Sequence, residues 1–318
     1  MIDSLLFVLE TVLPVFFVVG AGYFCRRVNL LADSVTTGLL TFTTTIAAPV
    51  LLFLGMYNLD LGEMFRADLL VSFYAGAIAC FFLAMFGARK IFGMRPGESV
   101  AVGFAALFSN SLLLGVPVTE RAYGTDALGP NFAIIAIHAP LCYMIGITAM
   151  EMSRADGRGA AATARAVVTA MFRNALTIGI AIGLAFNLLG LRMPGPLEGG
   201  VEMLARAALP VALFGLGGAL TRYSLRKGIG PAAMVAGIGL MIHPAITFGL
   251  SAGVFGLPEG MVRSATLTAS MPPGVNAYVF AAMYARAVGE AASAVLLATA
   301  ISVLSVSAWL VAVSHAGF

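Results

Sequence analysis

Long stretches of this chain carry almost no charge, and their lengths decide what the chain can fold into. Ten such runs follow one another with short polar breaks between them, at residues 4–25, 35–57, 69–88, 99–119, 127–150, 173–191, 203–221, 231–257, 264–285 and 291–314. A helix that crosses the hydrocarbon core of a bilayer needs about 20 apolar residues. The runs predict an all-α integral membrane protein with ten transmembrane helices. Because Arg206 lies inside the seventh run, nine or eleven helices are the alternatives.

The composition agrees with such a chain and excludes other classes. Of the 318 residues, 60% are hydrophobic and only 10% are charged, whereas soluble domains carry about 25% charged residues. The chain therefore has too few charged groups to cover a water-facing surface, and ten helices leave no room for a separate soluble domain. The cysteines, Cys25, Cys80 and Cys142, stand far apart without a CxxC pair. We expect no disulfide framework, no metal site and no cofactor.

The polar loops are expected to sort by charge, because Lys and Arg favour the cytoplasmic side of a membrane. With ten helices, alternate loops lie on the same side. Of the 18 Lys and Arg residues, one set of loops and helix ends holds only Arg66, Arg121, Arg192, Arg206 and Arg263. The other set is therefore expected in the cytoplasm. This orientation puts both termini outside the cytoplasm, with the chain crossing the inner (plasma) membrane of the cell many times.

The longest polar break, at 153–172, divides the chain into two halves, 1–152 and 173–318, with five predicted helices each. An odd number of helices gives the halves opposite orientations, so homologous halves form an inverted repeat. The sequences AAPVLLF at 47–53 and ALPVALF at 208–214 share Ala, Pro, Val, Leu and Phe at the same positions. Both lie in the second helix of their half. The pattern predicts two inverted five-helix repeats joined by a cytoplasmic linker.

The fourth predicted helix of each half is interrupted by proline and glycine. The first contains Gly115 and Pro117, and the second contains Pro272, Pro273 and Gly274. Proline removes a backbone donor and clashes with the preceding turn, so this sequence in mid-membrane is expected to break the helix. Unwound backbone at that depth is tolerated only against protein or a watery cavity. Matching interruptions in two repeats indicate a transport site.

A broken helix also supplies binding groups. The N-terminus of a half-helix offers free N–H groups and a partial positive charge, both of which favour an anion. The predicted substrate site consists of Ser109, Asn110, Ser111, Gly115, Pro117, His138, Met271, Pro272, Gly274 and Asn276. The alternative is a pair of ordinary proline-kinked helices whose Asn side chains bond neighbouring backbone.

Other ionisable groups lie within the apolar runs and are candidates for function. His138 precedes Pro140 and is a candidate for contact with the ligand or with a proton, and a neutral histidine that bonds a carbonyl is the alternative. His243, directly before Pro244, is expected to be structural. Glu10 is expected near the outer surface.

Enzyme chemistry is not expected. The sequence at 249–253 matches the GxSxG pattern, but it lies in an apolar run rather than at the strand–turn–helix junction that this pattern requires in hydrolases. The sequence has no Walker loop for ATP. The GxxxG spacing of Gly179 and Gly183 predicts close packing of two helices instead.

Together these patterns resemble the auxin efflux carrier family, which includes plant auxin carriers and bacterial permeases for malate and malonate. The resemblance covers nearly the whole chain. Its motifs are Leu13-Pro14-Val15-Phe16-Phe17 with Gly20 and Gly22-Tyr23, Pro49 to Phe53, Asn110-x-Leu112-x-x-Gly115-x-Pro117 with Tyr123-Gly124, Arg173-Asn174, Leu209-Pro210 to Gly217, and Met271-Pro272 followed by Ala281 and Tyr284.

The resemblance implies a fold related to that of the bile acid sodium symporters. Helices 1, 2, 6 and 7 then form a scaffold that holds a homodimer. Helices 3–5 and 8–10 form a transport core, in which the broken helices 4 and 9 cross at the substrate. By resemblance, Asn110 contacts a substrate carboxylate. Asn276 stands where plant carriers usually have an apolar residue, and the long hydrophilic middle loop of many plant carriers is missing.

We therefore expect a secondary transporter of small organic anions, malate, malonate or auxin-like, with an elevator or rocking alternating-access mechanism. Its partners are expected to be the anion, the membrane lipid and a second copy of the chain, with no nucleic acid. A membrane sensor that binds a ligand without moving it is the alternative. The predicted helices at the site contain no mid-membrane Asp or Glu, so we expect transport without sodium, either down the membrane potential or linked to protons.

Overall fold

The computed structural model describes residues 2–153, 165, 168–169, 174–225 and 228–316. Every regular element in these ranges is a helix. Most of the linker predicted at 153–172, and Arg173 of the family motifs, lie outside the described residues.

The α-helices are α1 (Ile2–Arg27), α2 (Asp33–Phe42), α3 (Ala48–Tyr57), α4 (Leu61–Met64), α5 (Ala67–Lys90), α6 (Pro96–Leu107), α7 (Val116–Tyr123), α8 (Gly129–Met152), α10 (Ala175–Leu188), α11 (Gly195–Leu220), α12 (Ile229–Gly237), α13 (His243–Phe248), α14 (Glu259–Ala269), α15 (Val275–Tyr284) and α16 (Val288–His315). Five short segments have other helical forms: η1 (Thr43–Ala47), η2 (Ser111–Gly115), η4 (Ile238–Ile242) and η5 (Gly249–Val254) are π-helical, and η3 (Thr125–Leu128) is a 3-10 helix.

Among the described residues, seven helical spans are long and apolar enough to cross a membrane: Leu6–Arg27, Asp33–Tyr57, Ala67–Lys90, Thr125–Met152, Gly195–Leu220, Ile229–Val254 and Val288–His315. Two further apolar helices, α10 and α15, are shorter. The chain is thus an all-helical integral membrane protein, as the sequence predicts. The run predicted at 203–221 belongs to a longer helix, α11, in which Arg206 forms an exposed ion pair with Glu202.

Proline explains three of the wide π turns. The segments η1, η2 and η4 end two residues before Pro49, Pro117 and Pro244. A proline inside a helix lacks an N–H group, and its ring clashes with the carbonyl one turn earlier. A π turn is wider than an α turn, so it accommodates the ring while the helix continues beyond it.

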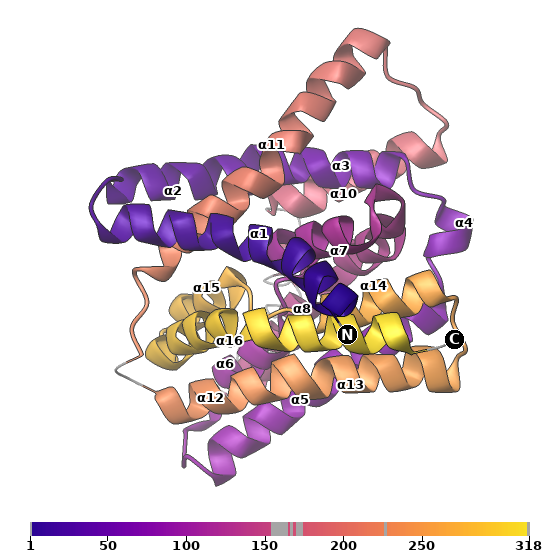
Figure 1. The fold of residues 1–318 in the computed structure, drawn as a ribbon. Helices are drawn as coiled ribbons and strands as arrows, with labels where there is room; N and C mark the ends of the chain where they lie inside the picture. The colour runs from indigo at the N-terminus through magenta and orange to yellow at the C-terminus, as the bar shows by residue number, and fades with distance from the viewer. Residues whose placement is uncertain (1, 154–164, 166–167, 170–173, 226–227, 317–318) are drawn as a thin grey trace.

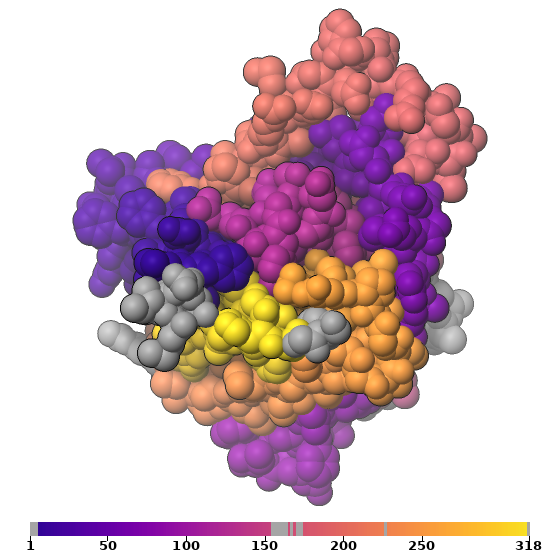
Figure 2. Space-filling view, turned by 45° about the vertical axis from the view of Figure 1, so that its right-hand side comes forward, coloured from indigo at the N-terminus to yellow at the C-terminus, as the bar shows by residue number. Residues whose placement is uncertain are grey.

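The helices form two groups with the broken elements between them. Figure 1 shows α1, α2, α3 and α11 along one side of the molecule and α5, α12, α13 and α16 along the other. The first group also includes α10, which packs on α3, and within it α1 packs on α11. In the second group α12 packs on α16 and α13 on α5. Figure 2 shows α7 and the turn after it at the surface between the two groups. The arrangement leaves the breaks of the chain near the middle of the molecule.

Glycines bring helices of the first group into backbone contact. A β-carbon at Gly22 of α1 would collide with the carbonyl oxygen of Phe214 in α11, and one at Gly183 of α10 would collide with that of Phe53 in α3. Gly179 meets Pro49 in the same way. The close packing predicted from the GxxxG spacing is therefore present, and only glycine fits these positions.

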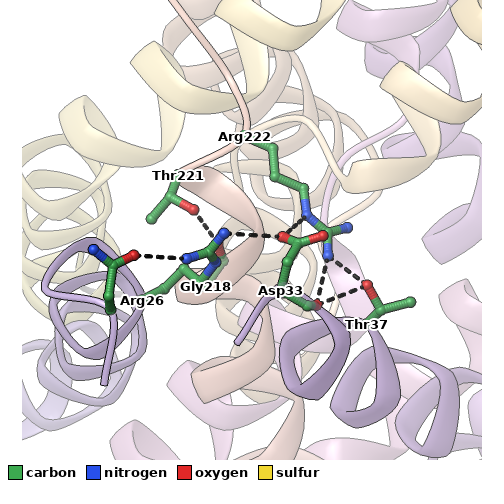
Figure 3. A network of polar contacts seen from close by, with 7 residues as sticks. Arg26, Asp33, Thr37, Gly218, Thr221 and Arg222 are labelled. Carbon is green, nitrogen blue, oxygen red and sulfur yellow. Dashed lines mark hydrogen bonds and ion pairs between the residues drawn. The ribbon is translucent and has the colours of Figure 1, made fainter. Parts of the chain in front are cut away.

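Polar contacts join the ends of these helices. At one end, Asp33 at the start of α2 accepts hydrogen bonds from Arg222 Nε at 3.0 Å and from Arg26 Nη2 at 3.5 Å (Figure 3). At the other end, Asn187 Nδ2 of α10 lies 2.8–3.0 Å from the carbonyl oxygens of Met56, Tyr57 and Leu59. The Asn187 amide thus satisfies carbonyls that a helix end leaves without intrahelical partners, and the Asp33 ion pairs join α2 to α1 and to the turn after α11.

Candidate functional site

Both predicted helices are broken, and their unwound segments pair with each other. The second break lies at Pro272 and Pro273 as predicted, whereas the first lies at 108–110, before Gly115 and Pro117, which η2 and α7 include. Helix α6 ends at Leu107, and α14 ends at Ala269. Beyond these ends, Ser109 and Pro273 form an isolated antiparallel pair. The N–H of Asn110 donates to the carbonyl of Pro272 at 2.8 Å, and the N–H of Gly274 donates to the carbonyl of Phe108 at 3.0 Å. Each unwound segment thus satisfies backbone groups of the other, as buried backbone requires.

A new helix begins directly after each crossing segment. The π segment η2 starts at Ser111 and leads into α7, and α15 starts at Val275. The first N–H groups of a helix have no partner within the helix, and the aligned peptide dipoles place a partial positive charge there. Two helix N-termini therefore meet at one point, with positive ends that an anion can approach from the same side.

A cavity of about 300 Å³ lies against this point. Six of the predicted residues line it: Ser109, Asn110, Ser111, His138, Gly274 and Asn276. The facing wall comes from α2, η1, α3 and α10 and is largely apolar, with Leu40, Ala48, Leu52 and Ile180 among its residues. The lining residues include no Asp, Glu, Lys or Arg. The cavity thus combines a polar crossing with an apolar wall.

The other predicted residues lie outside this cavity. Met271 is 1% exposed and packs into the hydrophobic core. Pro272 contributes its backbone carbonyl to the crossing, and Pro117 lines a different cleft. Gly115 contributes its N–H, which donates to the carbonyl of Asn110 at 3.1 Å. These residues shape the crossing rather than face the cavity.

Two amide side chains in the cavity wall have hydrogen-bonding groups without a protein partner among the described residues. Asn110 is 6% exposed, and among the described residues its side chain has no hydrogen-bond partner. Asn276 accepts a long hydrogen bond from Tyr143 Oη at 3.4 Å, and its amide nitrogen has no partner there either. The hydroxyls of Ser109 and Ser111 lie 2.8 Å apart. Buried amides usually find partners, so this pattern indicates a place for a ligand or for ordered water.

His138 supports the crossing. Its Nε2 lies 3.2 Å from the carbonyl oxygen of Ser109, and its Nδ1 lies 3.8 Å from Cys142 Sγ. Its ring meets Phe108 edge to face, with 4.7 Å between the ring centroids. Both ring nitrogens therefore have neighbours, and the neutral ring can donate to Ser109 and accept from the thiol. The ring is placed to fix the backbone on one side of the site.

His243 and Glu10 stand away from the cavity. The Nε2 of His243 lies 3.1 Å from the carbonyl of Phe73 in α5, in agreement with the structural role that the sequence predicts. The carbonyl of Glu10 in α1 accepts from Arg121 Nη2 at 2.9 Å. The described residues contain no group of His, Cys, Asp and Glu side chains that could hold a metal ion.

Three side-chain hydroxyls at the site were not predicted from the sequence. Tyr143 reaches Asn276, and Thr44 and Thr177 line the apolar wall of the cavity. None of the three is adjacent in sequence to a proline, a glycine or a charged residue. A single hydroxyl in an apolar helix has no distinctive pattern, because Thr and Ser also bond the carbonyl one turn earlier. Only the packing of η1, α8 and α10 against the crossing identifies them.

A second, wider cleft of about 520 Å³ lies between α1, α3, α7 and α11. Pro14, Pro117 and Pro210 line it, together with Arg121 and Arg206. It is separated from the first cavity by an apolar cluster of buried side chains that includes Leu52, Val116, Leu128 and Ile135. The protein therefore has one hollow on each side of an apolar barrier.

An all-helical membrane chain with two hollows and crossed, broken helices has the architecture of a transport protein, and the comparison with known families agrees. The chain belongs to the membrane transport protein family, whose profile matches residues 7–310. This confirms the resemblance to the auxin efflux carriers. Membership makes the chain a transporter with a small-molecule substrate rather than an enzyme.

Individual relatives are distant, and two of the three described here match nearly the whole chain. A protein of Methanothermobacter thermautotrophicus named "Uncharacterized transporter" is 27% identical over 94% of this chain and 96% of its own length. A Rhizobium meliloti protein named "Putative malonate transporter" is 25% identical over 93% of this chain and 92% of its own length. The mouse "Lysosomal cholesterol signaling protein" is 27% identical over 64% of this chain and 25% of its own length.

Proposed function

We propose that the protein is a secondary transporter that moves a small organic anion through the membrane without changing it chemically. The observation that carries the proposal is the meeting of two helix N-termini and two amides with spare hydrogen-bonding groups, Asn110 and Asn276, at one cavity. The Rhizobium meliloti relative, named for malonate, points to the same class of substrate. Malate, malonate and auxin-like carboxylates are the candidates.

The electrostatics of the cavity favour a carboxylate. Each helix N-terminus carries a partial charge of roughly +0.5, and two of them face the cavity without a competing Asp or Glu among its lining residues. Pockets for small ligands start at about 300 Å³, which is the size of this one. The carboxylate is proposed to accept hydrogen bonds from the backbone at Ser111 and Val275 and from the amide of Asn110.

The proposed architecture is ten transmembrane helices in two inverted repeats, residues 1–152 and 173–318. The glycine contacts support it. The offset along the chain that aligns Pro49 with Pro210 also aligns Gly22 with Gly183 and Phe53 with Phe214. The contact between Gly22 and Phe214 therefore has its repeat-related counterpart in the contact between Gly183 and Phe53. The first group of helices, α1, α2, α3, α10 and α11, corresponds to the predicted scaffold from helices 1, 2, 6 and 7. The remaining elements correspond to the predicted transport core.

The proposed mechanism is alternating access by an elevator or rocking motion. With the cytoplasmic side assigned from the loop charges, the cavity at the crossing lies toward the cytoplasm, since Leu40 and Leu176 near the cytoplasmic ends of their helices line it. The cleft that Arg121 and Arg206 line lies on the outer side. The apolar barrier would then close the outer path in this state and open in the other.

The proposal also covers the membrane, the oligomeric state and the coupling ion. We place the chain in the inner (plasma) membrane with both termini outside the cytoplasm, and we propose a homodimer built on the scaffold. We also propose transport without sodium, because hard cations favour oxygen ligands that include carboxylates, and the lining residues have none.

A membrane sensor is the second candidate. The mouse relative, whose name refers to cholesterol signaling, is the observation that favours it. That match covers only a quarter of the mouse protein, whereas the two relatives named as transporters match over nearly their full lengths. We therefore favour transport.

A flux assay in proteoliposomes tests the proposal. Radiolabelled mono- and dicarboxylates are offered one at a time, with the membrane potential, the pH gradient and the sodium gradient set separately. We expect saturable flux of at least one carboxylate without a sodium gradient. Binding without flux, for every member of the panel, would favour the sensor, and flux that requires sodium would contradict the proposed energy source.

A further inference from the structure

A groove on the outside of α5, α6 and α8 lies apart from the crossing. It holds about 670 Å³ and shares no lining residue with the cavity or the cleft described above. On α5 its wall includes Phe82, Met85 and Arg89, and on α8 it includes Met144 and Met152. These spacings put each set on one face of its helix. The two helices thus form the sides of a trough along the membrane normal.

The trough is apolar over most of its length and faces outward. The side chains of Phe82 and Met152 are 54% and 82% exposed. From Phe82 to Arg89 the helix rises about 10 Å, which matches about half of a lipid acyl chain. In a membrane protein, an exposed apolar trough of this length meets lipid rather than water.

One end of the trough carries a positive charge without an acidic partner. Arg89 lies in the last turn of α5, and its Nε donates to Ser99 Oγ at 3.0 Å. This contact holds the guanidinium at the end of the groove. Among the described residues Arg89 forms no ion pair with a carboxylate, and Lys90 beside it is exposed and has none either. Arginine matches the geometry of a phosphate group, which it can bind with two parallel hydrogen bonds.

We propose that this groove binds one anionic glycerophospholipid, such as phosphatidylglycerol. Its phosphate pairs with Arg89, and one acyl chain lies between α5 and α8. The loop charges put this end at the cytoplasmic leaflet, where anionic lipids attract Lys and Arg. Because α6 leads into the crossing and α8 carries His138, the lipid rests on two elements that hold the transport site.

Native mass spectrometry tests the proposal without any transport assay. The purified protein is equilibrated with an equal mixture of phosphatidylglycerol and phosphatidylcholine in mild detergent, and the retained lipids are counted. We expect one retained phosphatidylglycerol in the wild type and at least a tenfold smaller retained fraction in Arg89→Gln. Arg27→Gln is the matched control, since Arg27 is an exposed arginine in the last turn of α1, away from the groove.

A second variant separates the charge from the groove. Thr148 lines the trough, so Thr148→Phe fills it and leaves Arg89 in place. We expect this variant to lose the lipid as well. Ser99→Ala, which removes the contacts to Arg89 Nε and to the carbonyl of Pro96 but keeps the cation, is expected to retain most of it. Because Thr148→Phe keeps the cation, it decides the question even where Arg89→Gln fails to fold. Equal lipid retention by wild type and Thr148→Phe would overturn the proposal.

Discussion

Replacement of Asn110 by alanine is expected to weaken binding of the carboxylate strongly and to leave the fold intact. The side chain has no partner among the described residues, so its removal breaks no internal hydrogen bond. The backbone contacts of Asn110 with Pro272 and Leu114 remain available to alanine. The expected loss is therefore one hydrogen bond to a charged ligand, which is worth about 1.5–3 kcal/mol.

That free energy corresponds to a loss of roughly ten- to a hundredfold in affinity. Asn276→Ala is expected to behave in the same way, since the bond that it gives up to Tyr143 is long. Isothermal titration calorimetry in detergent measures the affinity, and the melting temperature reports the fold. Asn58→Ala is the matched control, because Asn58 is exposed at the end of α3. Affinities of both site variants within about twofold of wild type would refute the assignment of the site.

Three further predictions concern the fold and the crossing. Gly183→Leu places a side chain against the carbonyl of Phe53 and should destabilise the protein by at least 1–3 kcal/mol, seen as a lower melting temperature; an unchanged value would contradict the close approach of α3 and α10. Asn187→Ala removes the donor to three carbonyls at the end of α3 and should cost about 1–3 kcal/mol in the free energy of unfolding, which thermal denaturation can compare with Asn58→Ala. His138→Ala frees the carbonyl of Ser109 and should reduce carboxylate affinity less than Asn110→Ala does; a flux that loses its dependence on the pH gradient in His138→Ala would instead assign proton coupling to this ring.

The features that the sequence predicted best are those of the local backbone, namely where helices run and where they break. The break at Pro272 could be predicted because proline and glycine act on their own turn of helix, whatever surrounds them. The other break, at 108–110, contains neither residue, and the π segment η2 accommodates Pro117 beyond it. The apolar runs likewise mark the helices, because membrane thickness fixes the length of a span. The GxxxG pair in α10 predicted close packing, and its partner, α3, became known only from the structure.

The site itself depends on contacts between distant segments. No pattern showed that the carbonyl of Pro272 would accept from Asn110, or that Thr44 and Thr177 would line the facing wall. His138 was expected at the ligand or as a carbonyl partner, and it both lines the cavity and lies against the carbonyl of Ser109. Such pairings follow from how helices pack, which single-residue chemistry does not determine. The linker at 153–172 lies almost wholly outside the described residues, so its cytoplasmic position stays a prediction.

The most direct test of the central claim is an experimental structure with a brominated carboxylate bound, located by anomalous diffraction from the bromine. We predict a bromine peak in the cavity of about 300 Å³, with carboxylate oxygens at hydrogen-bond distance from the backbone N–H groups at the starts of η2 and α15. A single peak in the outer cleft beside Arg121 and Arg206, with none at the crossing, would contradict the claim that two helix N-termini hold the anion.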